Sequence, residues 1–172
     1  MVEYLDDLEL NLCLRVNALS RVGLVRRFFS AVSRLGDYPA WVIFGVVCAL
    51  QQGDGALPFA VQALATAAAG ILVYKVLKQR LVRERPYVTH GDIVCGEKPL
   101  DRYSFPSGHT LHAISLTTLY GTYEPALLIV MAPFAAFVAA SRIVLGLHYP
   151  SDVLVGGTIG AVLATASLLL VS

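Results

Sequence analysis

Long runs of apolar residues, separated by short polar segments, dominate the pattern along this chain. Residues 56–74 and 153–171 contain no charge, and residues 125–147 are interrupted by a single one, Arg142. A helix needs about 20 mostly apolar residues to cross the apolar core of a bilayer, which is about 30 Å thick. These three runs therefore predict membrane-spanning helices.

Two shorter runs extend the predicted bundle. Residues 38–52 are uncharged but short, and residues 106–123 carry no acidic or basic residue other than His109 and His112. With the three longer runs, they predict an all-α integral membrane bundle of about five transmembrane helices. We expect residues 37–172 to form this single membrane domain.

The first 36 residues follow a different pattern. Apolar residues recur at helical spacing from Leu5 to Leu19, and five arginines alternate with apolar residues further along the segment. The acidic start, with Glu3 and Asp6, differs from the basic start of a signal peptide. We expect residues 1–36 to form N-terminal amphipathic interfacial helices, with the basic side towards lipid headgroups. The alternative is a solvated helical face packed on the rest of the protein.

The composition fits a membrane protein and argues against other classes. Of the 172 residues, 56% are hydrophobic and 15% are charged, whereas about 25% are charged in typical soluble domains. The net charge of +1 offers no basic surface, so we expect no nucleic-acid partner. The cysteines, Cys13, Cys48 and Cys95, are widely spaced, which predicts neither a disulfide framework nor a thiolate metal site.

The basic residues gather at one end of the predicted bundle. If the five runs cross the membrane in alternating directions, all 13 Lys and Arg fall on one side. Such a bias marks the cytoplasmic side of a membrane protein. It favours an inner-membrane protein with this side in the cytoplasm. Some of these cations can instead serve a substrate, so a periplasmic or extracellular location stays open.

Polar residues beside a membrane span are costly and indicate function, and three clusters of them lie on this basic side. In the first cluster, Lys78 and Arg85 are seven residues apart. A helix that continues to Pro86 places both cations on one face, where they suit a phosphate group. Taken alone, the cluster is better explained by cations that extend towards lipid headgroups.

The second cluster, Ser107, Gly108 and His109, stands at the start of a predicted helix. Free backbone N–H groups at a helix N-terminus bind anions. A histidine in the first turn can face such an anion and protonate a leaving oxygen. The alternative is that Ser107 is merely an N-cap and His109 a surface residue.

The third cluster combines Arg142 with His148 and Asp152, which are one helical turn apart. A carboxylate at that distance can hold Nδ1 of the imidazole and leave Nε2 free as a nucleophile. Alone, such a pair is more often a structural hydrogen bond. Together, the three clusters supply cations, imidazoles and a carboxylate, which are the groups that phosphoryl transfer requires.

In order and spacing, these clusters resemble the three-part signature of the type-2 phosphatidic acid phosphatases. The matching positions are Lys78, Arg85, Pro86, Pro106, Ser107, Gly108, His109, Ser141, Arg142, His148 and Asp152. The resemblance covers roughly residues 56–172. It implies a hydrolase that needs no metal and no cofactor and that acts on a lipid phosphate monoester or pyrophosphate in the bilayer. Phosphatidate, phosphatidylglycerophosphate and polyprenyl phosphates all remain candidates.

The resemblance also implies a role for each signature residue. His148 would be the nucleophile that forms a phosphohistidine, and Asp152 would orient it. His109 would protonate the leaving oxygen and then activate water. The implied substrate-binding residues are Lys78, Arg85, Ser107, Gly108 and Arg142.

Three alternatives compete with this interpretation. A vanadate-dependent haloperoxidase shares the signature, but those enzymes are large and soluble. A zinc hydrolase could use His109, His112, His148 and Asp152. A non-enzymatic membrane protein that binds or transports lipids would explain the spans but not the His–Asp pair. The sequence also leaves a homo-oligomer open, together with the roles of His112, Arg80 and Arg83.

Overall fold

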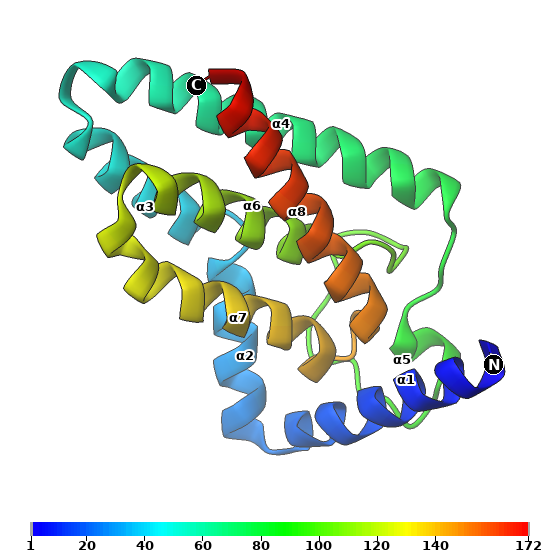
Figure 1. The fold of residues 1–172 in the computed structure, drawn as a ribbon. Helices are drawn as coiled ribbons and strands as arrows, with labels where there is room; N and C mark the ends of the chain where they lie inside the picture. The colour runs from blue at the N-terminus through cyan, green and yellow to red at the C-terminus, as the bar shows by residue number, and fades with distance from the viewer. Residues whose placement is uncertain (1, 172) are drawn as a thin grey trace.

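The computed structural model describes residues 2–171, with side chains from Asp7 onward, and every regular element in that range is helical (Figure 1). The acidic residues Glu3 and Asp6 and the apolar Leu5 are therefore outside the described side chains. The elements in chain order are α1 (Val2–Asn17), η1 (Ala18–Arg21), α2 (Gly23–Leu35), α3 (Pro39–Gln51), η2 (Gly53–Gly55), α4 (Ala56–Arg80), α5 (Pro86–Thr89), α6 (Gly108–Tyr123), η3 (Pro125–Leu127), α7 (Leu128–Val144) and α8 (Pro150–Val171).

Three helical segments are long and apolar enough to cross a membrane, and they coincide with the three long runs of the sequence. The segments are Gly53–Arg80, Pro125–Val144 and Pro150–Val171. At 1.5 Å per residue, α8 is about 33 Å long, which matches the thickness of the apolar core of a bilayer. The prediction of an all-α integral membrane protein is confirmed.

The count of five spanning helices is not confirmed, because α3 and α6 are short. They contain 13 and 16 residues, which correspond to about 20 Å and 24 Å. Nine of the residues of α6 are buried, and this helix packs against α3, α4, α7 and α8. In Figure 1 α6 runs through the middle of the bundle. It is therefore the central helix around which the longer helices pack.

Small residues allow α8 to lie directly against α6. A Cβ atom on Gly160 would lie 2.3 Å from the carbonyl oxygen of Leu111, and one on Gly156 would lie 2.5 Å from that of Ser107. Close backbone approach of this kind is how helices associate in lipid, where there is little hydrophobic drive. The contact also fixes the start of α6 relative to the start of α8.

The N-terminal helices pack against the membrane helices rather than standing apart. Helix α2 contacts α7, and α1 contacts α7 and α8. At the end of α1, the buried amide of Asn17 donates to the carbonyl oxygens of Val94 and Val144, both at 2.9 Å. Asn17 thus joins α1 to the long loop and to the end of α7. The location of residues 1–36 at the membrane surface and the domain boundary at residue 37 stay predictions.

We expect Gly160→Ala to destabilise the protein, because its methyl group would clash with the backbone of α6. The expected cost is about 1–3 kcal/mol, seen as a lower midpoint of thermal unfolding in detergent. Gly157→Ala is the matched control, since its Cβ would meet side chains at an ordinary 3.6 Å. Equal midpoints for the two variants would contradict the close approach of α6 and α8.

Candidate active site

Lys78 and Arg85 come together, but not by the route that the sequence predicts. Helix α4 ends at Arg80, and Arg85 has an extended backbone, so the two cations do not share a helical face. Instead they meet at the carboxylate of Asp101, whose Oδ1 accepts from Lys78 Nζ at 2.7 Å and from Arg85 Nη2 at 2.6 Å. The continuous helix to Pro86 is therefore wrong, and the long loop provides the link that brings the cations together.

Arg142 reaches the same region from the last turn of α7. It is 2% exposed, and its Nη1 donates to the hydroxyl of Ser33 in α2. Its Nε has no hydrogen-bond partner within the described part of the chain. A buried guanidinium with an unpaired donor is costly, so this arginine is well suited to receive an anion.

A tight turn after α7 places His148 among these cations. Gly146 adopts a positive φ of 71°, and the backbone N–H of His148 donates to the carbonyl oxygen of Arg142 at 3.0 Å. A Cβ on Gly146 would lie 2.7 Å from the carbonyl oxygen of Val94, so both the backbone angle and the space require glycine. The imidazole Nε2 of His148 is 3.2 Å from Arg85 Nη1.

The surroundings of His148 keep its ring neutral. The side chain is 1% exposed, and burial lowers its pKa well below the ordinary value. The positive charges of Arg142 and Arg85 lower that pKa further. A neutral imidazole has a free nitrogen lone pair, which a nucleophile needs.

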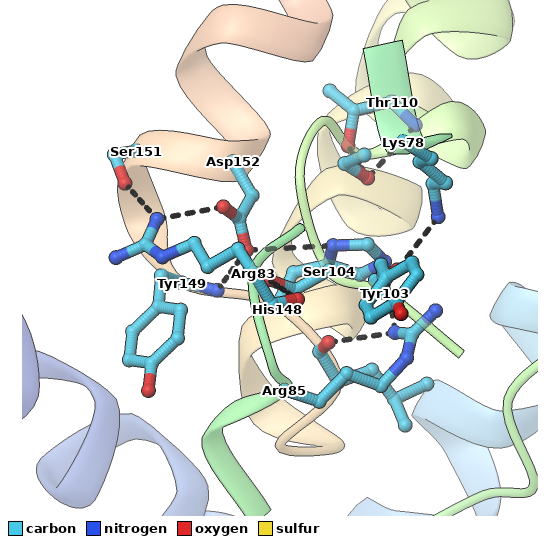
Figure 2. A network of polar contacts seen from close by, with 12 residues as sticks. Lys78, Arg83, Arg85, Tyr103, Ser104, Thr110, His148, Tyr149, Ser151 and Asp152 are labelled. Carbon is cyan, nitrogen blue, oxygen red and sulfur yellow. Dashed lines mark hydrogen bonds and ion pairs between the residues drawn. The ribbon is translucent and has the colours of Figure 1, made fainter. Parts of the chain in front are cut away.

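Asp152 lies behind His148 in the first turn of α8. Its Oδ2 is 3.6 Å from His148 Nδ1 and accepts from the backbone N–H of Tyr149 at 2.8 Å. Its Oδ1 accepts from Arg83 Nη1 at 2.7 Å (Figure 2). The carboxylate is thus fixed in place, close to Nδ1 but longer than a hydrogen bond.

The start of α6 brings in Ser107, Gly108 and His109. Ser107 caps the helix, since its Oγ accepts from the backbone N–H of Thr110 at 3.4 Å. His109 follows in the first turn, and its Nε2 is hydrogen-bonded to the carboxylate of Asp37, in the turn between α2 and α3. Burial lowers the pKa of His109, and the positive charge of Arg142 lowers it further, whereas the Asp37 carboxylate acts in the opposite direction and favours the protonated ring.

Six of the eight predicted site residues line one cavity of about 170 Å³. They are Lys78, Arg85, Gly108, His109, Arg142 and His148. Ser107 and Asp152 lie behind its wall, Ser107 as the helix cap and Asp152 beside His148. His112, whose role the sequence leaves open, also lines the cavity and meets the ring of Tyr74 edge-on.

Sequence reasoning missed four groups that hold these residues in place. Asp101 pairs with two of the cations, Asp37 with His109, Ser33 with Arg142, and Arg83 with Asp152. Each contact joins residues far apart in the sequence, so no local spacing indicates it. The sequence singled out Arg83 beside the first cluster and Asp152 in the third, but it did not indicate that the two residues pair.

The donors that a zinc site would need do not assemble. In the part of the chain that the structure describes, no three His, Cys, Asp or Glu residues are grouped closely enough to hold a metal ion. The cavity instead presents several buried cations and three imidazoles. Cations of this kind bind a dianionic phosphoryl group, and imidazoles can attack it or transfer a proton to its ester oxygen. Fold and site together define a helical membrane protein with a cavity whose cations and histidines suit a phosphoryl group.

Comparison with known sequences supports that class. The family model of the PAP2 superfamily matches residues 59–172. A decaprenylphosphoryl-5-phosphoribose phosphatase of Mycolicibacterium smegmatis is 37% identical over 134 residues, which are 73% of this chain and 68% of that protein. The protein of the same name from Mycobacterium tuberculosis is 36% identical over 137 residues, covering 76% of this chain and 71% of that one.

Solved structures share the fold. A transmembrane PAP2-type phosphatidylglycerolphosphate phosphatase from Bacillus subtilis aligns with a TM-score of 0.68 at 24% identity, covering 91% of this chain and 84% of that one. LpxE of Aquifex aeolicus aligns with a TM-score of 0.70 at 23% identity, covering 89% and 92%. This chain therefore belongs to the PAP2 superfamily, which confirms the resemblance seen in its sequence. Within that superfamily it is a hydrolase of phosphate esters embedded in a membrane.

We expect Arg83→Gln to lower kcat by about 10- to 100-fold, as loss of a group that positions a reacting side chain commonly does. Without the guanidinium, the Asp152 carboxylate loses its 2.7 Å partner and no longer has a fixed position beside His148. The measurement is phosphate release from a lipid phosphate, with the folded state checked by thermal unfolding.

Arg102→Gln is the matched control for Arg83→Gln. Arg102 belongs to the same loop, but its side chain is 74% exposed and pairs with Glu84 at the surface. The Arg102→Gln variant should therefore retain the wild-type kcat. Equal loss in both variants, or full activity in Arg83→Gln, would contradict the positioning role.

We expect the His148 ring to stay neutral at pH 6.5, where an ordinary imidazole is half protonated. Its lowered pKa means that the neutral, nucleophilic form is lost only as the pH falls further. NMR of protein labelled with 13C-histidine, with His148→Gln to assign the signal, measures this directly. A His148 signal that titrates at or above pH 6.5 would show the expectation to be wrong.

Proposed function

We propose that this protein is a metal-independent phosphatase that hydrolyses a lipid phosphate monoester or pyrophosphate through a phosphohistidine on His148. One observation carries the proposal: three cations and the two signature histidines, His109 and His148, come from separate helices and loops to line the same cavity of about 170 Å³. Neither headgroup binding nor protein packing requires two imidazoles among buried cations. An in-line phosphoryl transfer requires them.

In the first step, Nε2 of His148 attacks phosphorus and the bond from phosphorus to the leaving oxygen breaks. Lys78, Arg85 and Arg142 hold the equatorial oxygens, where charge is spread in the transition state. His109 gives its proton to the leaving oxygen, which departs as an alcohol or, from a pyrophosphate, as a phosphate. The leaving oxygen replaces Asp37 as the partner of that proton.

In the second step, His109 takes a proton from water, and the hydroxide attacks the phosphohistidine. The P–N bond breaks, inorganic phosphate forms and His148 returns to its neutral state. Asp152 holds the imidazole in orientation during both steps. Division of one displacement into two lowers the barrier of each.

An apolar groove next to the cavity supports a lipid as the substrate. The groove has a volume of about 390 Å³ and is lined by apolar side chains of α3 and α4 together with α6. It adjoins the phosphate cavity at Asp37, Ile71 and His112, which line both. A lipid chain can lie in this groove while its headgroup enters the cavity. The relatives' name makes a polyprenyl-linked phosphate the first substrate to test.

We place the protein in the inner membrane with the site at its cytoplasmic face. The support is the charge bias, since α1 and α2 carry arginines and pack at the end of the bundle where the site lies. We also propose that substrate enters from the bilayer, and a homo-oligomer stays open.

We expect His148→Ala and His109→Ala each to reduce phosphate release by about 10³-fold or more, because the nucleophile or the proton donor is lost. Wild-type protein incubated with 32P-labelled substrate should carry an acid-labile label that His148→Ala lacks. EDTA should leave activity intact, and vanadate should inhibit by mimicking five-coordinate phosphorus.

His90→Ala is the control for these histidine variants, because His90 does not line the cavity. It should keep wild-type activity. Full turnover in His148→Ala, or complete inactivation by EDTA, would refute the proposed mechanism.

A further inference from the structure

A second polar chamber adjoins the phosphate cavity at His109. Its volume is about 320 Å³, and its polar lining includes Arg34, Asp37, Glu97, Lys98, His109 and Arg142. It shares Asp37, His109 and Arg142 with the phosphate cavity. Nothing in the phosphate-binding role of the cavity uses this chamber.

Glu97 gives the chamber its chemical character. Its side chain is only 10% exposed, and one oxygen, Oε1, accepts from Ser30 Oγ at 3.1 Å and from Arg34 Nε at 2.8 Å. The other oxygen, Oε2, is buried and has no hydrogen-bond partner among residues 7–171. A buried carboxylate oxygen without a donor is costly, so this atom is placed to receive one.

The histidines that line the phosphate cavity and the chamber indicate what can occupy the chamber. His148 lines the phosphate cavity but not the chamber, whereas His109 lines both. In an in-line displacement the nucleophile and the leaving oxygen lie on opposite sides of phosphorus. If His109 protonates the leaving oxygen, the group attached to that oxygen extends towards the chamber.

We propose that this chamber binds a hydroxyl-bearing leaving group, a sugar placed between the reacting phosphate and the lipid, and that Glu97 Oε2 accepts from its hydroxyls. This inference rests on the proposed function. A simple lipid phosphate attaches an apolar chain to the leaving oxygen and would leave the Glu97 oxygen without a donor. Sites built to bind a hydroxyl discriminate strongly against analogues that lack it.

The apolar groove is consistent with such a substrate. Asp37 lines the phosphate cavity, the chamber and the groove. The three spaces therefore meet at one residue. A phosphate, a sugar and a chain can occupy them without passing through the protein interior.

The test compares two substrates in wild type and Glu97→Gln. One substrate is a polyprenylphosphoryl-5-phosphoribose, and the other is the polyprenyl phosphate that lacks the sugar. The glutamine keeps an oxygen for Ser30 and Arg34 but replaces the acceptor Oε2 with an amide donor. We expect kcat/KM to fall by about 10- to 100-fold for the sugar phosphate and to change less than about twofold for the plain phosphate.

Ser30→Ala is the matched control, because it removes a contact to Oε1 of the same carboxylate and leaves Oε2 untouched. It should preserve the preference between the two substrates. An equal fall on both substrates in Glu97→Gln would show that Glu97 is purely structural and would overturn the proposal. Unchanged kinetics on both would also overturn it.

A binding measurement separates this proposal from the proposed function. In His148→Ala, which cannot turn over, isothermal titration should show that ribose 5-phosphate binds more tightly than inorganic phosphate, and that adding Glu97→Gln removes the difference. Equal binding of the two probes to His148→Ala would refute the proposal that the chamber binds a sugar. If wild type hydrolyses neither lipid but the difference in binding remains, the proposed function fails while the chamber stands.

Discussion

The burial of three cations beside one histidine is the constraint on which the rest of this structure depends. Lys78, Arg85 and Arg142 are each less than 10% exposed, and their charges add to burial in lowering the pKa of the His148 imidazole. Such a cluster is unstable without anions, and Asp101 supplies one from the long loop. Contacts from the surrounding fold hold these like charges close together, in a cavity that suits a phosphate group.

Several elements far apart in sequence meet that constraint together. Helix α4 delivers Lys78, the loop delivers Arg85 and Asp101, and the turn at Gly146 delivers His148. The glycine face of α8 positions the start of α6. The N-terminal helices lie outside the matched family region, yet they supply Ser33 next to Arg142. The candidate site of this chain therefore extends beyond the family signature.

Much of this could be predicted from the sequence because the signals were local. Uncharged runs of 19 or more residues indicate spans, and fixed spacings indicated the three clusters, since helix geometry relates neighbours within a turn or two. The helix expected to continue from Lys78 to Pro86 was wrong, because α4 ends at Arg80 and tertiary contacts of the loop then set the path. Nothing in the sequence indicated two of the carboxylates that balance the site, Asp37 and Asp101. Asp37 and His109 are 72 positions apart, and no periodicity links them.

The bridge at Asp101 has a consequence for how the protein handles its product. Because one oxygen of this carboxylate pairs with both Lys78 and Arg85, an incoming phosphate competes with a tethered anion for the same two charges. The free energy of phosphate binding is then the difference between two interactions of the cations, one with phosphate and one with Asp101. Under the proposed function, we therefore expect free phosphate to bind only weakly, because the returning Asp101 carboxylate competes with it for the same two cations.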